Sequence, residues 1–253
     1  LRRFGCEATF QGRWGQDKFG DMIEADLTAE GIRFNSPPRQ ADTKTGFAHV
    51  WVEHGTGRRS IAGYRGSHQI QEREVHGELL RNHVALHLDG WSTDAAIRAA
   101  RQVKDNGGVV FLDLGSPKPH LDRLLAQVDS VNCPRNLLHR LYKTDDPQTG
   151  AKELLRRGPE QVTVTEGVHG AWLFRKGRPG IHQSAFPIAA TDTNGAGDTF
   201  AGAMIYATMQ GWPAERRLLF ATATAALKCT RIGNRSALPS LDAIAQLLDT
   251  SAT

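Results

Sequence analysis

The chain has few cysteines, no long apolar run and no block of like charge among its 253 residues. Cys6, Cys133 and Cys229 are widely separated, and no C-x2-C pair offers the spacing of a zinc or redox site. This use of cysteine predicts a reducing, cytoplasmic environment. No apolar run approaches the length of a membrane span and no signal-peptide pattern opens the sequence, so no membrane partner is predicted.

The charge is also unremarkable in amount and pattern. Lys and Arg number 31 against 27 Asp and Glu, which gives a net charge of +4. The charges are interspersed, without the basic blocks typical of nucleic-acid-binding arms, so no nucleic-acid partner is predicted. The length suits one large domain with a buried core, or a core with a small appendage.

Strands and helices alternate along the second half of the sequence. Short apolar runs predict strands at 84–88, 109–112, 128–131, 161–165 and 171–174. Between and after them, helical patterns cover 94–105, 121–127, 152–157, 198–210, 214–228 and a last amphipathic segment from Leu241. This alternation predicts an α/β fold with a mostly parallel sheet covered by helices.

Residues 37–69 read differently from the rest. Ala48–Glu53 alternates, Gly55-Thr56-Gly57 suits a turn, and 59–64 is extended again, which predicts an inserted β-hairpin. A hairpin this apolar needs a partner, either a substrate that it covers as a lid or a second copy of the chain in a homodimer. We therefore expect a core formed by 1–36 and 70–253 and a lid at 37–69. The hairpin's apolar side chains are Phe47, Val50, Trp51, Val52, Ile61 and Tyr64.

The most informative stretch is Asp192–Phe200, where a glycine turn enters an apolar helix. Glycines at a helix start present backbone N–H groups to an anion such as phosphate. The acid Asp198 at the same place suggests proton removal beside a bound phosphate. The spacing of Gly195, Gly197 and Gly202 does not match the dinucleotide pattern G-x-G-x-x-G, and no Walker P-loop occurs. The alternative is that Asp198 only caps the helix.

Four ordered segments resemble the PfkB, or ribokinase-like, family of sugar and nucleoside kinases. They are Gly12–Gly20 (G-x-x-G-x-D-x-F-G), Thr165–Ala171 (T-x-G-x-x-G), Asp192–Phe200 (D-T-x-G-A-G-D) and Ala225–Gly233. The resemblance covers essentially the whole chain. It implies a three-layer sandwich with a mostly parallel central sheet and a small β lid.

The resemblance also implies the reaction. Asp198 would be the base that accepts a proton from a sugar hydroxyl, and Gly195, Ala196 and Gly197 would form the anion hole for the transferred phosphoryl group. ATP with Mg²⁺ is the implied donor, because phosphoryl transfer depends on electrostatic neutralisation. The implied function is ATP-dependent phosphorylation of a sugar hydroxyl by an enzyme of ribokinase, fructokinase or ketose-kinase type.

Further site residues follow from the same resemblance. Nucleotide contacts are implied at Thr165, Gly167, Gly170, Thr222 and Asn194, although glycine turns and ordinary packing of the small helix face explain the same residues. Many members bind a monovalent cation, so K⁺ is an optional cofactor here. Its implied ligands are Asp192, Asn194, Lys228, Arg231 and Gly233, mostly through backbone carbonyls.

Two acids end predicted strands. Strand ends of a parallel sheet face the ligand crevice, and the family resemblance implies an acid there near the sugar, so Asp89 is a candidate sugar contact; the alternative is a cap of the next helix. Asp113 has the same two interpretations. His87 is interpreted as a residue of the sheet face and not as a ligand.

Two departures from the family pattern limit the prediction. Where the family has an N-x-x-E motif linked to Mg²⁺ and phosphate, Pro134 and Arg135 stand here and no glutamate follows; Asn132 and Asn136 are poor substitutes. The family's first sugar-binding signature is also not seen, and we expect an N-terminal segment to be missing before Leu1. A non-catalytic sugar- or nucleotide-binding member, or a nucleoside kinase, therefore stays an alternative.

Overall fold

The computed structural model describes residues 1–35, 39, 42–53, 55 and 59–250. Contacts divide the chain into two compact units, one from Phe4 to Val75 and one from His76 to the C-terminus. Each unit forms its own sheets. The narrower lid predicted at 37–69 stays a prediction.

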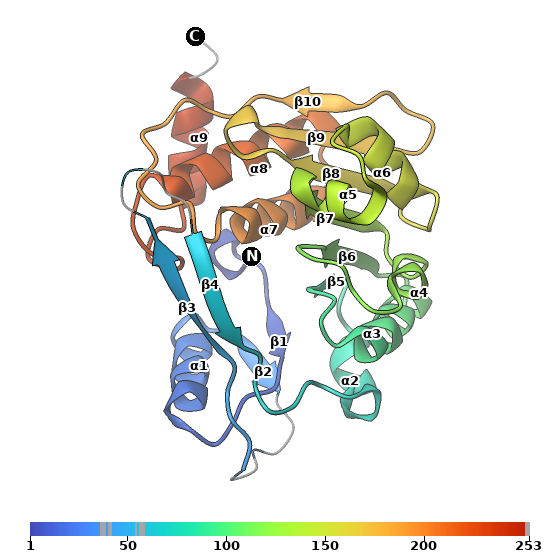
Figure 1. Ribbon diagram of the computed structural model, residues 1–253, viewed down its shortest axis with the longest axis vertical. Coiled ribbons are helices and arrows are strands. Elements are labelled where there is room, and N and C mark those ends of the chain that lie inside the picture. The colour runs from blue at the N-terminus through green and yellow to red at the C-terminus, as the bar shows by residue number, and fades with distance from the viewer. Residues whose placement is uncertain (36–38, 40–41, 54, 56–58, 251–253) are drawn as a thin grey trace. The chain divides into compact units, whose positions relative to one another are not determined.

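The larger unit contains a six-stranded sheet in the order β10-β9-β8-β7-β6-β5 (Figure 1). The pairs β5–β6, β6–β7 and β7–β8 are parallel, whereas β9 is antiparallel to both β8 and β10. The mostly parallel sheet is therefore confirmed. Its strands are β5 (Ala85–Leu88), β6 (Val109–Asp113), β7 (Ser130–Pro134), β8 (Gln161–Thr165), β9 (Ala171–Arg175) and β10 (Ile181–Gln183).

Both faces of this sheet are covered by helices. Consecutive residues of β6, β7 and β8 are buried, so side chains on both faces are out of water, as in other parallel sheets. Helices α3, α5, α6 and α7 contact these strands, and α8 contacts β9 and β10. The helices are α2 (Gly77–Leu80), α3 (Thr93–Asp105), α4 (Leu121–Leu125), α5 (Arg135–Tyr142), α6 (Pro147–Leu155), α7 (Ala196–Met209), α8 (Ala214–Cys229) and α9 (Leu241–Thr250).

Helices α7 and α8 form the tightest helix pair of this unit, side by side in Figure 1. Ala203, Ala207, Ala221 and Ala223 are fully buried, and such small side chains let two helices approach closely. The apolar helix predicted at 198–210 is thus confirmed, with its start at Ala196. No helix in the described ranges is long and apolar enough to cross a membrane.

Three helices of the larger unit differ from the sequence expectation, and the four-residue helix α2 is one that was not predicted. Helix α5 was not predicted, because it is short and its N-cap Pro134 has no capping side chain. Helix α6 begins five residues before the predicted start. Asp146 caps it by accepting the Thr149 N–H at 2.9 Å, and Pro147 occupies the first turn.

The smaller unit contains two two-stranded sheets and one long helix. Strands β1 (Thr9–Gln11) and β2 (Arg33–Asn35) form a parallel pair, and α1 (Lys18–Ala29) lies between them in the sequence. Strands β3 (Phe47–Val52) and β4 (Arg59–Tyr64) form the predicted antiparallel hairpin. In the predicted turn, Thr56 and Gly57 lie outside the described residues. Every residue of β3 is exposed, Trp51 by 59% and Val52 by 65%, so the apolar hairpin face is open in the single chain.

The aspartate of the early glycine-rich segment has a structural role. Asp17 caps α1 by accepting the Gly20 N–H at 2.9 Å. It also accepts the Thr45 hydroxyl at 2.6 Å and the Thr45 N–H at 2.9 Å. The Thr45 side-chain bond is the largest cause that lowers the pKa of Asp17 to about 2, followed by the backbone N–H groups of Thr45 and Gly20. Asp17 therefore joins α1 to the base of the hairpin.

Candidate active site

The carboxyl ends of the parallel strands bring distant residues to one edge of the larger unit's sheet. The register pairs Leu88 with Leu112, Asp113 with Asn132, and Pro134 with Thr165. Residues that end or follow these strands therefore line up along this edge. In parallel α/β sheets this edge is where ligands bind. The aligned positions are Asp89, Asp113, Arg135 and Glu166.

Acidic side chains gather at the β5–β6 end of the edge. Asp113, Asp89 and Asp198 all act electrostatically on His87, and Asp198 also acts on Asp113. Burial raises the pKa of the Asp113 carboxyl above its ordinary range, because water is displaced from around the charge. The pKa of His87 is lowered chiefly by the same desolvation, although the residue as a whole is not buried. The structure thus brings Asp198 of α7 to the two strand-end acids.

The Asp89 side chain forms a local turn. Its Oδ1 accepts the Trp91 N–H at 2.9 Å. The N-cap of α3 is Ser92, so Asp89 does not cap that helix. Of the two interpretations of Asp89, the helix cap is wrong, and the sugar contact stays a prediction.

A row of buried polar side chains crosses three strands and ends at Asp113. The Thr163 hydroxyl donates to Asn132 Oδ1 at 3.0 Å, and Asn132 Nδ2 donates to Asp113 Oδ1 at 2.9 Å. Thr163 and Asn132 are both buried. These bonds fix the position of the Asp113 carboxylate. They also show that the Asn132 amide is directed along the sheet face, to Asp113 and Thr163.

Sequence reasoning missed this polar row, although a signal existed. In β7 and β8, Ser130 and Asn132 and then Gln161 and Thr163 alternate with apolar residues. Strands buried on both faces are ordinarily apolar throughout. Polar residues at every second position of such strands indicate one face that meets a site.

The predicted anion hole lies at the start of α7. Gly195 is the N-cap and has φ = 77°, a left-handed conformation that favours glycine. The Ala196 N–H donates to the Thr193 carbonyl at 3.2 Å, so this amide is engaged in the turn. Gly197 and Asp198 follow in the first turn, where N–H groups have no acceptor within the helix, and both residues are exposed. The arrangement suits an anion beside the Asp198 carboxylate.

The predicted nucleotide loop connects β8 to β9. It is a short 3₁₀ helix, η3 (Gly167–His169), and the Glu166 N–H donates to the Gly170 carbonyl at 2.8 Å. A Cβ atom at Gly170 would lie 2.0 Å from the Gln183 carbonyl oxygen of β10. Gly170 is therefore required by the close approach of β10, in addition to any role in binding. Gly167 faces open space.

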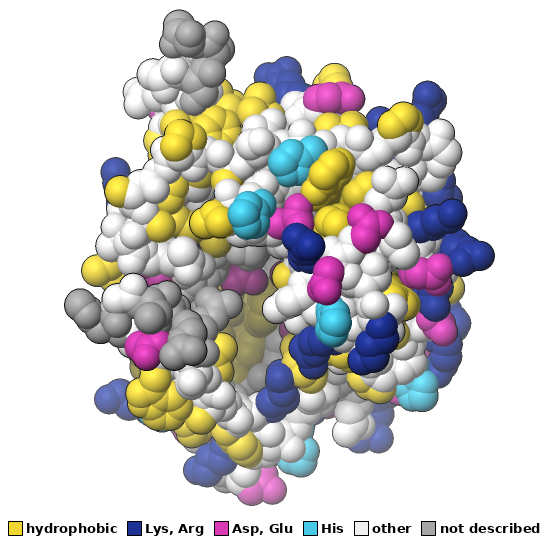
Figure 2. Space-filling model, turned by 45° about the horizontal axis from the view of Figure 1, so that its top comes forward, with side chains coloured by type: hydrophobic (Ala, Val, Ile, Leu, Met, Phe, Trp, Pro, Cys, Tyr) yellow, Lys and Arg dark blue, Asp and Glu magenta, His cyan; other side chains and the backbone are white. Residues whose placement is uncertain are grey.

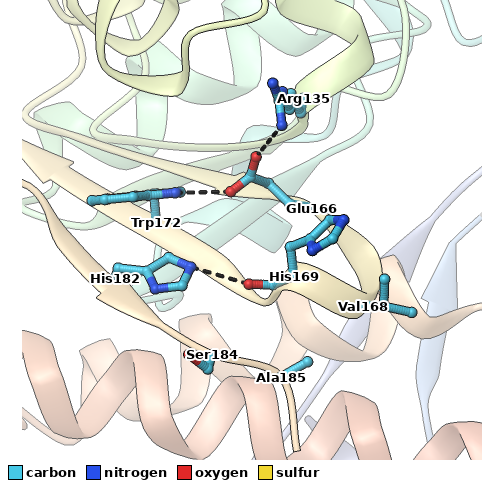
Figure 3. A pocket seen from close by; sticks show the side chains of 8 residues that line it. All are labelled: Arg135, Glu166, Val168, His169, Trp172, His182, Ser184 and Ala185. Atoms are coloured by element: carbon cyan, nitrogen blue, oxygen red, sulfur yellow. Dashed lines mark hydrogen bonds and ion pairs between the residues drawn. The ribbon is translucent and has the colours of Figure 1, made fainter.

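A cavity of about 540 Å³ opens beside this loop (Figure 3). One carboxylate oxygen of Glu166 accepts Arg135 Nη1 at 2.9 Å, and the other accepts the Trp172 indole N–H at 2.8 Å. The His182 ring lies against Trp172, with the ring centroids 4.6 Å apart and the ring planes tilted by 44°. The His182 Nε2 atom also lies 3.0 Å from the His169 carbonyl oxygen. The remaining lining residues are Val168, Ser184 and Ala185.

A second cavity of about 360 Å³ shares Arg135, Glu166 and His169 with the first, so the two adjoin. Thr165, Asn136 and Asp145 are among its other lining residues. Figure 2 shows histidine side chains beside acidic and basic ones in the upper half of the view. On the same face, Lys and Arg are interspersed with Asp and Glu. Thr165, which was predicted to contact the nucleotide, lines the second cavity together with the positively charged side chain of Arg135.

Thr222 lies inside α8 and not on a cavity wall of the described site. It is 6% exposed, and its hydroxyl donates to the Leu218 carbonyl at 2.8 Å. The small residues around it, such as Ala221 and Ala223, are fully buried. Helix packing accounts for this stretch, and its predicted nucleotide contact stays a prediction.

The residues predicted for a monovalent cation surround a buried lysine. Lys228 has no exposed surface, and its Nζ donates to the Asp192 carbonyl at 2.8 Å and lies 3.5 Å from Asp192 Oδ2. The Asp192 carboxylate also accepts the N–H groups of Gly233 at 3.0 Å and of Asn194 at 2.9 Å. These bonds, that of Gly233 first, lower the pKa of Asp192. Arg231 is exposed, and no described side-chain bond joins it to this group.

This arrangement does not fit a free monovalent cation bound to the same oxygens. Such an ion would lie within a few ångströms of the Lys228 ammonium. Two unit charges about 4 Å apart repel by roughly 4 kcal/mol at an effective dielectric constant of about 20. Among the described residues there is also no group of three His, Cys, Asp or Glu side chains placed to hold a metal ion.

Comparison with known proteins places the chain in a family. Residues 1–241 match the pfkB family carbohydrate kinase. A ribokinase of Arabidopsis thaliana is 31% identical over 248 residues, which cover 92% of this chain and 64% of that protein. A 5-dehydro-2-deoxygluconokinase of Halalkalibacterium halodurans is 26% identical over 275 residues, covering 99% of this chain and 82% of that relative.

A solved structure agrees with these sequence relatives. Arabidopsis thaliana ribokinase, solved with ribose and ATP, superimposes with a TM-score of 0.81 at 27% identity, covering 98% of this chain and 83% of that one. The ribokinase-like fold and the family resemblance are therefore confirmed. The chain belongs to the pfkB family of carbohydrate kinases.

Proposed function

We propose that the protein transfers the γ-phosphoryl group of ATP to a hydroxyl group of a sugar, with Asp198 as the base. The observation that carries this proposal is the position of Asp198. Its exposed carboxylate lies in the first turn of α7, directly after the Gly195 turn and within electrostatic range of Asp113. A proton acceptor and an anion site are thus adjacent, as phosphoryl transfer to an alcohol requires.

The proposed chemical step uses both features. The hydroxyl proton moves to the Asp198 carboxylate while the hydroxyl oxygen bonds to the γ-phosphorus. The bond from the γ-phosphorus to the bridging oxygen breaks, and ADP leaves with that oxygen. The N–H groups at Gly195–Gly197 and the positive end of α7 stabilise the charge on the phosphoryl oxygens. Because the Ala196 N–H already donates to Thr193, the amides after it carry more of this role.

The nucleotide belongs at the β7–β9 end in this proposal. Thr165 and the η3 loop border the cavities, and Arg135 supplies a guanidinium that can hold phosphate oxygens directly. Mg²⁺ would arrive as part of the ATP complex, held mainly by phosphate oxygens, because Mg²⁺ in kinases is bound through substrate phosphates with few protein ligands. A relative from Escherichia coli described as ribokinase II was solved with ATP and Mg²⁺. We leave K⁺ out of the proposed cofactors, because Lys228 lies against Asp192.

The acceptor is proposed to be a sugar with several hydroxyl groups. Asp89 and Asp113 lie at the β5–β6 end with Asp198, and carboxylates accept hydrogen bonds from hydroxyls. The named relatives phosphorylate ribose and a deoxygluconate, which fits this class. A binding protein without transfer activity is the second candidate. The observation that favours it is the Pro134-Arg135 sequence, which stands where the family has its N-x-x-E motif and is followed by no glutamate.

A coupled assay of ADP release tests the proposal. We expect ADP release with MgATP and at least one member of a panel of pentoses, hexoses, ketoses and deoxysugar acids. Mass spectrometry should show a product heavier by one phosphoryl group. Tight binding of ATP or sugar by calorimetry, with no ADP release for any panel member, would support the binding protein instead.

We also propose that the β3–β4 hairpin pairs with a second copy of the chain, in a reducing cytoplasm. Six large apolar side chains are exposed on its two strands, and an exposed apolar patch marks a surface that can bind a partner. They are Phe47, Val50, Trp51, Val52, Ile61 and Tyr64. Sedimentation should give a dimeric mass that falls when Trp51 and Val52 are changed to Ser. A monomeric mass at high protein concentration would contradict the dimer.

A further inference from the structure

We propose that the Lys228 ammonium is the resident cation of the α8–α7 junction, so that this protein needs no K⁺ to hold its phosphate-binding turn. The catalytic part of this inference, that Lys228 supports the turn that binds phosphate, rests on the proposed function. Its structural part concerns only residues of α8, the segment before α7 and the loop after α8.

The first argument is the burial of the charge. Lys228 has an exposed fraction of 0%, and lysine is almost never fully buried unless it is paired. Its ammonium contacts the carbonyl and the carboxylate of Asp192. It also lies in the last turn of α8, whose carbonyl end favours a positive charge. The surroundings are therefore built for one cation, and the side chain supplies it.

The second argument is the connection from this charge to the turn. The Asp192 carboxylate holds the N–H of Asn194, which directly precedes Gly195, and the N–H of Gly233. The Cys229 carbonyl accepts the N–H groups of Thr191 and Asp192 at 2.8 and 3.1 Å. Three segments therefore meet at Asp192, and the ammonium neutralises their shared carboxylate.

The third argument is that the turn and the loop after α8 touch. A Cβ atom at Gly195 would lie 3.1 Å from Asn234 Oδ1, so the loop limits where Gly195 can sit. Gly233 joins that loop to Asp192. Loss of the cation would leave the Asp192 carboxylate without its nearest positive charge and loosen both attachments of the turn. Lys228 is thus a positioning residue for Gly195–Asp198.

The test compares K⁺ with a bulky organic cation in matched buffers. Wild-type protein is measured in potassium chloride and in choline chloride, each at about 0.15 M ionic strength. The readouts are ATP affinity by calorimetry, the midpoint of thermal unfolding, and ADP release where a sugar substrate is found. We expect the three readouts of the wild type to be the same in both buffers.

Lys228→Ala removes the ammonium and leaves room for a free ion. In choline its ATP affinity should fall about tenfold, since hydrogen bonds to charged groups are lost, and its unfolding midpoint should fall. K⁺ or methylammonium should restore both, which a purely structural role of the side chain would not produce. Lys228→Met keeps the volume of the stem and should be impaired without rescue, and it keeps the test open if the alanine variant does not fold.

Lys176→Ala is the matched control. Lys176 Nζ also binds a carbonyl and a carboxylate, those of Gly158 and Glu160, but at the surface. Its removal should create no response to K⁺. A K⁺-induced rise in the wild-type midpoint or ATP affinity would overturn the inference, as would a Lys228→Ala variant that binds ATP normally in choline. Because binding and unfolding are read without turnover, these outcomes are distinct from failure to find a sugar substrate.

Discussion

The two ends of the carboxyl edge of the sheet differ in charge and in construction. At the β5–β6 end, Asp113 is held by a buried polar row across the strands and lies near Asp89 and Asp198. At the β7–β9 end, Arg135 is held by Glu166 beside open cavities. Carboxylates suit hydroxyl groups and proton removal, whereas a guanidinium suits phosphate. For the proposed reaction, this difference assigns the sugar acceptor to the β5–β6 end and the ATP donor to the β7–β9 end.

The sharpest way to break this comparison is to change the proposed base. Asp198→Asn should lower turnover by about 10²- to 10⁴-fold, because a general base contributes roughly that much. ATP affinity should stay nearly unchanged, because the donor end is intact. Steady-state kinetics and calorimetry measure both values. Asp105→Asn, at the exposed end of α3, is the control, and retained turnover in Asp198→Asn would refute the assigned base.

The next largest effect is expected at the donor end. Arg135→Gln should weaken ATP binding about tenfold, since a charge-assisted hydrogen bond is lost, with a smaller change in sugar affinity. Titration calorimetry with ATP gives the affinity. Arg140→Gln, an exposed change on the same helix, should leave it unaltered. Equal ATP affinities for wild type and Arg135→Gln would show that the guanidinium does not hold the nucleotide.

At the β5–β6 end, the charge of the partly buried Asp113 carboxylate is expected to lower the free energy of unfolding. Because burial raises the pKa of Asp113, the fold loses stability as pH rises from the unfolded-state pKa through the folded-state pKa, and the full cost is present above both. Asp113→Asn should therefore stabilise the protein at pH 7 by an amount on the order of 1 kcal/mol. The gain should vanish below about pH 3.9, where unfolded Asp is protonated as well. Chemical denaturation at both pH values decides, and a loss of stability at pH 7 would contradict the argument.

The smallest effect concerns the support of Arg135. Trp172→Phe removes the indole N–H that binds Glu166 and keeps an aromatic ring beside His182. ATP affinity should fall about threefold, the value of one ordinary hydrogen bond. Sugar affinity should not change, because Asp89 and Asp113 belong to the other end. A larger effect on sugar than on ATP would reverse the assignment of the two ends.

Much of the larger unit follows from local sequence. Strand β8 and the start of α8 were predicted at their observed positions, because Gln161–Thr165 and the run after Pro213 carry clear period and start signals. Strand β10 and the β1–β2 pair are three residues long and carry no usable period. Helix α6 shows a missed signal, since Asp146-Pro147 is a favoured helix start.

The candidate site divides in the same way. The Gly195–Asp198 turn is one continuous stretch, so its spacing indicates its chemistry. Arg135 and Glu166 are 31 positions apart in the sequence, and Lys228 and Asp192 are 36 positions apart. A local sequence pattern cannot predict contacts between residues so far apart. Sequence reasoning therefore selected the turn as a candidate site, which stays a prediction, and missed the partners that hold Arg135 and Lys228.

Lys228 illustrates a wider consequence of replacing a bound ion by a side chain. A dissolved ion must be captured from solution, so its occupancy follows the salt composition of the cell. A tethered ammonium is present at a fixed effective concentration set by its own chain. Its attachment to α8 also means that the helix cannot leave the junction without carrying the charge away. If Lys228 is the resident cation, folding of α8 and ordering of the Gly195–Asp198 turn are coupled into one event.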